Sequence, residues 1–245
     1  MSKTARFGCL NCHAGLRLKS MGIRMWRFLM IISFLLLSAC THYNEQQGYV
    51  ILGDQKSNRV WVYLCGLTRQ WDSSEERSNR KILEQIANKE HIKVVAIKSF
   101  ARCSQFDDKL CWPHDTQEQV KNTYANINHV ISGYDIDGFI GFSNGAFFLN
   151  RAAQEIALNK PIISIGGAGY FDSEKDIDTR IYLIIGKQDH SHYENAILFH
   201  KRANKYKHDS VQLMTHDSGH VMPEDIIRQV IHDLNQQAGV SYESK

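Results

Sequence analysis

The chain has 245 residues, of which 43% are hydrophobic, 22% are charged and only three are proline. These values indicate a globular protein with a sizeable core and exclude long disordered linkers. The formal net charge is +3, but residues 1–39 hold six Lys or Arg and no Asp or Glu, so the rest of the chain has 23 basic and 26 acidic residues, or −3. Without a basic stripe, we expect no nucleic-acid partner.

The segment before Cys40 has the order of a secretory leader. Arg24 and Arg27 precede an apolar run at 28–37, which is too short to cross a bilayer as a helix, and small residues follow it. The tetrapeptide LSAC, which ends at Cys40, resembles the bacterial lipobox. The resemblance implies cleavage before Cys40, lipidation of that residue and, with Thr41 after it, export to the outer membrane. An uncleaved anchor and a secretory signal without lipid are the alternatives.

Residues 1–20 fit no signal-peptide plan. They contain the pentapeptide CLNCH, which matches a haem-attachment pattern. Haem is attached on the far side of the membrane and this segment would leave with the leader, so we expect no haem. If translation starts at Met21 or Met25, the segment is never made. We therefore expect a leader at 1–40 and one folded domain at 41–245.

Four cysteines remain after the predicted cleavage. Export allows disulfides, and Cys103 and Cys111 lie in one loop-like stretch, so we expect them to form a bridge. Cys65 ends an apolar run and is expected to be a buried thiol. The spacings match no zinc pattern, and we expect neither a metal nor a cofactor.

Short β-branched and aromatic runs alternate with amphipathic segments along the rest of the chain. The first pattern predicts strands, and apolar residues three and four apart predict helices. The expected strands are 49–52, 59–65, 92–97, 136–142, 161–165, 180–185 and 211–215, the expected helices are 74–90, 115–132, 146–158, 192–206 and 223–237, and the cysteine-containing stretch is a loop. This alternation predicts an α/β fold with a doubly wound, mostly parallel sheet and a site at the carboxyl ends of its strands.

A serine lies where such a site requires a nucleophile. Ser143, in the sequence GFSNG, directly follows a predicted strand and opens a helix, and Gly141 and Gly145 are the small residues that a sharp turn needs. The pentapeptide also occurs by chance, so the residues that follow it in the chain decide whether Ser143 is a nucleophile. Asp189 follows the strand at 180–185, and His220 lies in the loop after the last strand. Nucleophile, acid and base in this order predict a catalytic triad.

Residues 59–238 resemble the α/β-hydrolase superfamily through GFSNG, GKQDH and DSGHVMP. GFSNG and LCWPHD also resemble, more loosely, the polyhydroxybutyrate-depolymerase and feruloyl-esterase branch. The resemblance implies a serine esterase in which Ser143 attacks an acyl carbon, His220 moves the proton and Asp189 orients the imidazole.

Two backbone amides are expected to bind the oxyanion. One is the amide of Asn144, directly after the nucleophile, and the other comes from the loop after Cys65. Leu67 is our choice there and Thr68 the reserve, because this loop lacks the His-Gly-Gly-Gly run of many lipases.

Each assignment has an alternative. Asp189 is also suited to cap the following helix, and His216, nearer the end of its strand, is the alternative base to His220. His190 and His192 are expected at the surface. The remaining candidates are aromatic residues that either line an acyl pocket or pack in the core or rim: Trp71, Trp112, Tyr170 and Phe171.

The connection at 166–179 leaves no room for a large cap domain, so we expect an open site. Such a site suits short-chain esters or acyl groups on polymers. A thioesterase, phospholipase or acyltransferase using the same triad is the first alternative. A surface lipoprotein that binds a ligand without turnover is the second.

Overall fold

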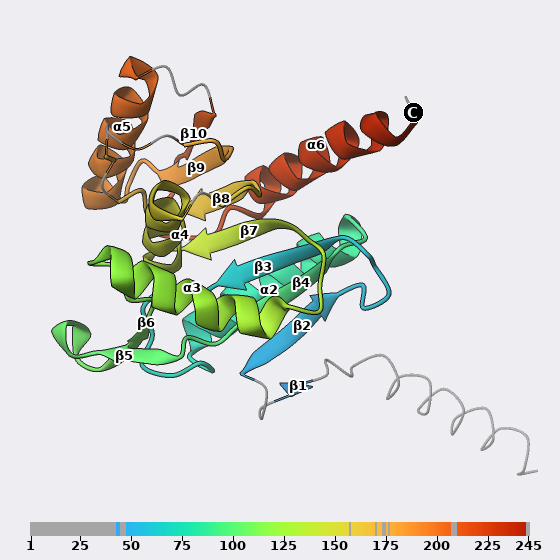
Figure 1. Cartoon of the computed structure of the whole chain (residues 1–245), viewed down its shortest axis with the longest axis horizontal. Coiled ribbons are helices and arrows are strands. Elements are labelled where there is room, and N and C mark those ends of the chain that lie inside the picture. Colours follow the sequence, from blue (N-terminus) through green and yellow to red (C-terminus); the bar gives the residue numbers. More distant parts are fainter. Residues whose placement is uncertain are drawn as a thin grey trace, which may run out of the picture. The chain divides into compact units, whose positions relative to one another are not determined.

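Runs of β-branched and aromatic residues form a twisted sheet of eight strands (Figure 1). In sheet order the strands are β1 (Tyr43–Asn44), β2 (Tyr49–Gly53), β4 (Lys93–Ile97), β3 (Val60–Leu64), β7 (Ile136–Phe142), β8 (Ile162–Ile165), β9 (Ile181–Gly186) and β10 (Val211–His216). From β4 to β10 the neighbours run parallel, whereas β1 and β2 are antiparallel additions at one edge. The predicted mostly parallel sheet is confirmed.

The computed structural model describes residues 43–44, 48–156, 158–169, 171–172, 175, 177–206 and 210–243. The predicted leader, its lipidation site Cys40 and the aromatic candidate Tyr170 lie outside these residues. Within the described ranges, no helix is both long enough and apolar enough to cross a membrane.

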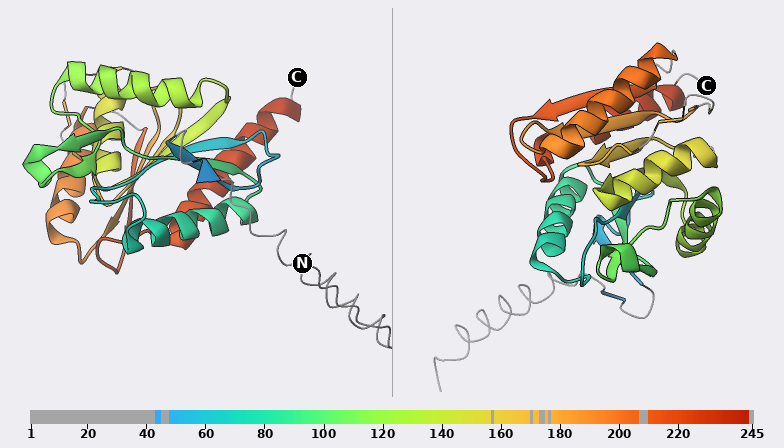
Figure 2. Two further views of the ribbon diagram at one scale, coloured as in Figure 1. Left: turned by 90° about the horizontal axis from the view of Figure 1, so that it is seen from below. Right: turned by 90° about the vertical axis from the view of Figure 1, so that its left-hand side faces the viewer.

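Helices cover both faces of the sheet, which is why every residue of β3 and β9 is buried. On one face α2 (Ser74–Lys89) packs against α6 (Glu224–Glu243), and on the other α3 (Gln117–Ile131) packs against α4 (Asn144–Glu155). Figure 2 shows the sheet between these two pairs. The remaining helix, α5 (His190–Lys205), lies against β9 and β10.

Local sequence explains where these helices begin. The Ser73 side chain accepts a hydrogen bond from the amide of Glu76 and caps α2. Thr116 and Gln119 form a capping box at the start of α3.

The loop between β10 and α6 contains His220. The connection between β8 and β9 is too short for a cap domain, as expected.

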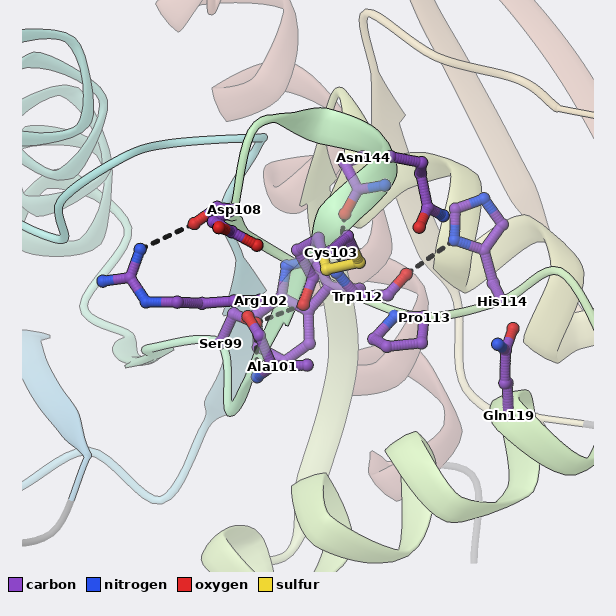
Figure 3. Close-up of a disulfide and its surroundings, with 12 residues drawn as sticks. Ser99, Ala101, Arg102, Cys103, Asp108, Trp112, Pro113, His114, Gln119 and Asn144 are labelled. Carbon is purple, nitrogen blue, oxygen red and sulfur yellow. Dashed lines mark hydrogen bonds between the residues drawn. A yellow bond between two sulfur atoms is a disulfide. The ribbon is translucent and has the colours of Figure 1, made fainter.

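The stretch that we expected to be a loop contains a small hairpin. Its strands are β5 (Ala101–Cys103) and β6 (Lys109–Cys111), joined through a 3-10 turn at Ser104–Phe106. A disulfide joins Cys103 to Cys111, the pair that the sequence suggested (Figure 3). Strands of three residues are too short to show alternation, so the sequence pattern missed them.

Candidate active site

Ser143 occupies a strained turn between β7 and α4. Its backbone has φ 50° and ψ −114°, an uncommon conformation for a residue with a side chain and one that costs about 1–3 kcal/mol. Its amide donates to the carbonyl of Ile165 at 2.8 Å, and its own carbonyl accepts from the amide of Phe147 at 3.0 Å. These two bonds hold the turn, and Ser143 remains partly exposed.

The backbone passes so close to Gly141 and Gly145 that neither position has room for a side chain. A Cβ added at Gly145 would lie 2.3 Å from the carbonyl oxygen of Leu64, and one added at Gly141 would lie 2.7 Å from the amide nitrogen of Ala146. Both distances are far below van der Waals contact. The helix therefore starts directly over the strand ends, two residues earlier than the sequence pattern predicted.

Asp189 lies just beyond the carboxyl end of β9. It is the N-cap residue of α5, but its side chain makes no capping hydrogen bond. Instead, Oδ2 lies 2.5 Å from Nδ1 of His220. The tertiary structure thus joins two residues that are 31 positions apart in the sequence.

A second histidine contacts the same carboxylate. Nδ1 of His192 lies 2.8 Å from Oδ1 of Asp189, and the two imidazole rings of His192 and His220 are 4.9 Å apart. The expectation that His192 is a surface residue is therefore wrong: its side chain is only 30% exposed and lies beside the Phe147 ring. The signal was its position three residues after Asp189, one turn into the helix. His190 is exposed, as expected.

These bonds set the charge of Asp189. Burial acts to raise the pKa of its carboxyl, but the hydrogen bonds from His192 and His220 outweigh burial and hold the pKa below the ordinary value of 3.8. At neutral pH the group is a carboxylate that accepts from both imidazoles.

His220 lies over the loop that follows β8. Its ring packs against Phe142 with centroids 4.9 Å apart, and a Cβ added at Gly166 would lie 2.8 Å from its Cε1. With Nδ1 engaged by Asp189, Nε2 is left for another partner. Ser143 and His220 line the same cavity, whereas His216, the alternative base, is not among the residues lining it.

A buried polar network holds the loop beneath His220. The Asn150 amide donates to Ser164 Oγ and to the carbonyl of Ala168, both at 2.8 Å, and Ser164 Oγ donates to the carbonyl of Gly167 at 2.6 Å. Buried hydrogen-bond networks of this kind keep a loop in one conformation, although Asn150 Oδ1 itself has no partner in the described residues. The space left by the missing side chain at Gly166 is therefore maintained for the imidazole.

The backbone hydrogen bonds distinguish the two candidate oxyanion donors. The amide of Thr68 donates to the carbonyl of Leu110 at 3.3 Å and is already engaged. The amide of Leu67 has no hydrogen bond within the described part of the chain. The amide of Asn144 belongs to the first turn of α4, where no helix carbonyl can pair with it.

The cavity beside Ser143 has a volume of about 140 Å³ and is lined by Gly66, Leu67, Thr68, Ser73, Glu75, Glu76, Asn79, Phe142, Ser143 and His220. Most of the aromatic candidates lie elsewhere. Trp71, Trp112 and Phe171 are buried in the hydrophobic core, and none of them lines this cavity. Helix α2 supplies more of the lining than the sequence pattern suggested.

Asp189, His192 and His220 are also the group whose ligand atoms lie close enough together to hold a metal ion, within 4.8 Å of one another in the described residues. Each Nδ1 atom is already hydrogen-bonded to one oxygen of the Asp189 carboxylate, so an ion would have to displace these hydrogen bonds.

Comparisons with known proteins agree with this architecture. The family model described as "Serine hydrolase (FSH1)" matches residues 55–228. The chain is similar to a carboxylesterase from Mesorhizobium loti, with a TM-score of 0.58 and 17% identity over 75% of this chain and 93% of that one. It is also similar to the Pyrococcus furiosus esterase Pf2001, with a TM-score of 0.54 and 17% identity over 77% and 83%. At such identities these structures establish the α/β-hydrolase fold. None of the curated proteins compared with the chain matches it.

Proposed function

The chain belongs to the FSH1 family of serine hydrolases, and we propose that Ser143, His220 and Asp189 are its catalytic triad. The observation that carries this proposal is the 2.5 Å contact between His220 and Asp189 beside a cavity that His220 shares with the strained Ser143. The family and the fold support ester hydrolysis as the general reaction. The catalytic triad and the acyl-enzyme intermediate are our proposal.

In the proposed reaction Ser143 Oγ attacks the ester carbonyl carbon while Nε2 of His220 takes the hydroxyl proton. The carbonyl oxygen becomes an oxyanion bound by the amides of Asn144 and Leu67. The C–O bond to the alcohol then breaks, and His220 gives the proton to that leaving oxygen. Water, deprotonated by His220, attacks the acyl-enzyme and releases the acid and free Ser143. Asp189, which is ionised at neutral pH, stabilises the imidazolium in both steps.

The small cavity and the missing cap domain support short acyl groups, free or attached to a polymer, as substrates. The same triad chemistry also serves thioesters, phospholipids and acyl transfer. A chain-length series of esters beside the matching thioesters distinguishes these substrate classes.

A fluorophosphonate reaction with the full-length protein tests the nucleophile. We expect one adduct, mapped by mass spectrometry to Ser143 and lost in Ser143→Ala. Ser78→Ala, on the exposed side of α2, is the matched control and should label like the wild type. A folded protein that forms no adduct would overturn the triad and favour a lipoprotein that binds a ligand without turnover.

We also propose that the protein is exported and anchored by lipid at Cys40. The support is the leader sequence alone: basic residues, a short apolar run and LSAC. Growth with an alkyne-tagged fatty acid should label the protein, and Cys40→Ser should abolish the label. Label in the inner-membrane fraction instead of the outer one would contradict the proposed location, and no label would contradict the anchor.

A further inference from the structure

The cavity beside Ser143 is lined on its α2 side by two buried polar side chains. Glu76 is 3% exposed and Asn79 is 6% exposed, and both line the cavity. They lie three positions apart, so they share one face of the helix. Neither is used in the proposed reaction at Ser143.

Both side chains have unused hydrogen-bonding capacity. Within the described residues, neither Asn79 Nδ2 nor Oε1 of Glu76 makes a hydrogen bond of ordinary geometry, although the Asn79 side chain is near enough to the Glu76 carboxyl to help lower its pKa. Glu76 Oε1 forms an ion pair with Nε of Arg80 at 3.9 Å, a distance too long for a hydrogen bond. Buried polar atoms normally have partners, so unpaired ones beside a nucleophile indicate that a ligand supplies the partner.

The surroundings hold Glu76 in place. Tyr63 donates from its hydroxyl to Oε2 of Glu76 at 3.1 Å, and Arg80 is itself held by the carbonyl of Trp71 at 3.1 Å and by Asp72 at 2.7 Å. These contacts hold the carboxyl group in its buried position. A rigid polar group of this kind is suited to recognition.

Charge excludes one class of ligand. Burial raises the pKa of Glu76 to about 8, although Tyr63 and Arg80 oppose the shift, and the exposed Glu75 lies at the same cavity. An anionic substrate arm would be repelled by the Glu75 carboxylate. A cationic ammonium group could not accept from the Asn79 amide, so the complementary group is an uncharged one that both accepts and donates hydrogen bonds. A hydroxyl accepts from the Asn79 amide and donates to a Glu76 oxygen, whether Glu76 carries a proton or not.

We propose that Glu76 and Asn79 form a subsite that binds a hydroxyl group on a short arm of the ester substrate. The proposal rests on Ser143 being the nucleophile. The cavity volume of about 140 Å³ is below the ~300–1,000 Å³ of pockets for drug-sized ligands, so the arm is short. An unsubstituted alkyl arm of equal length would leave Asn79 Nδ2 and Glu76 Oε1 without a hydrogen bond.

Matched ester pairs test this subsite and locate the arm. For the acyl side we would compare kcat/KM for 4-nitrophenyl 3-hydroxybutyrate and 4-nitrophenyl butyrate. For the alcohol side we would compare glycerol monobutyrate and propyl butyrate. We expect the hydroxylated member of one pair to react about ten- to a hundredfold faster, because an arm without the hydroxyl leaves buried polar groups unpaired.

Variants connect the preference to the two residues. Asn79→Leu and Glu76→Met remove the polar groups, and in both the ratio within the preferred pair should fall toward one. Glu76→Gln keeps hydrogen-bonding atoms and should retain most of the preference, which covers the case in which Glu76→Met does not fold. Ser78→Ala, exposed on the same helix, should keep the wild-type ratio.

The outcomes of these experiments separate failure of the subsite from failure of the proposed function. Equal rates in both pairs, or a preference that survives in Asn79→Leu, would overturn the subsite and leave esterase activity intact. That result would mean that ordered water completes these side chains. Absence of hydrolysis of every ester, together with no fluorophosphonate adduct, would overturn the proposed function and the subsite with it.

Discussion

The side chain of Asn144 accepts a hydrogen bond, 2.6 Å long, from the backbone amide of Trp112. This bond joins the first turn of α4, which supplies the proposed oxyanion amide, to the segment that directly follows the disulfide hairpin (Figure 3). The indole of Trp112 donates in turn to the carbonyl of Cys65, at the end of β3, at 2.8 Å. One buried tryptophan therefore contacts both backbone segments of the proposed oxyanion hole.

Asn144→Leu should lower both stability and rate. The substitution leaves the buried amide of Trp112 without an acceptor, at a cost of about 1–3 kcal/mol in the free energy of unfolding. We expect kcat to fall roughly tenfold as the oxyanion amide shifts. Asn144→Asp keeps the acceptor but adds a negative charge, so it should lower kcat with little loss of stability. Urea unfolding and ester kinetics measure the two effects, and equal stability of the leucine variant and the wild type would contradict the bond's role.

Removing the disulfide should affect the site as well as the fold. The hairpin pairs with the oxyanion loop through Thr68 and Leu110, whose amides and carbonyls exchange hydrogen bonds. Closing a loop of this size contributes about 2–3 kcal/mol in the chain-entropy model. The double variant Cys103→Ser with Cys111→Ser should lose that much stability and lose kcat more than it changes KM. Unchanged kcat in the folded variant would show that the hairpin does not hold the loop.

His192 is expected to be a positioning residue. His192→Ala removes the bond to Asp189 Oδ1, and kcat should fall roughly tenfold. Because His192 helps to lower the pKa of Asp189, its loss should raise that pKa, so the carboxyl should take up its proton at a higher pH on acidification. His192→Asn keeps a donor and should restore most of the rate. An unchanged rate in His192→Ala, or an Asp189 pKa that NMR titration finds identical in both proteins, would reject this role.

Gly166→Ala should damage catalysis through His220. The glycine has φ +64°, and a Cβ there would lie 2.8 Å from Cε1 of the imidazole. We expect kcat/KM to fall at least ~100-fold, with a loss of about 1–2 kcal/mol in stability from the left-handed backbone. Gly133→Ala is the control, since nothing lies within 4 Å of an added Cβ there. Comparable loss of activity in both variants would argue against the specific contact.

Glu76 should make stability depend on pH. Its folded pKa of about 8 exceeds the ordinary value of 4.5, so the folded state binds the proton more tightly and stability falls as pH rises from about 4.5 to 8. The expected loss is a few kcal/mol, on the scale of about 1.4 kcal/mol per unit of pKa shift. Tyr63, Arg80, Glu75 and the buried thiol of Cys65 are the charged or titratable groups that interact with it. Chemical denaturation across this range should show the slope, and Glu76→Gln should flatten it; an unchanged slope in that variant would assign it to other groups.

Much of the architecture follows from local sequence. β-branched runs and amphipathic spacing predicted the long strands and helices, because burial on both faces of a parallel sheet leaves an uninterrupted apolar pattern. Their order also placed Ser143, Asp189 and His220 at one edge of the sheet, since the carboxyl ends of parallel strands meet there. The glycines around Ser143 were also predictable, because a sharp turn over a strand end leaves no room for a Cβ.

Other features exist only through contacts between distant residues. His220 meets Asp189 across 31 positions in the sequence, and Trp112 meets Asn144 across 32. Glu76 and Asn79 looked like ordinary polar residues of an amphipathic helix, yet they are buried because that face of α2 borders the cavity. A local pattern records which residues are apolar. It does not record which polar residues are enclosed by neighbours, and that enclosure, which sets the partners, the pKa of Glu76 and the shape of the cavity, is decided by the tertiary structure.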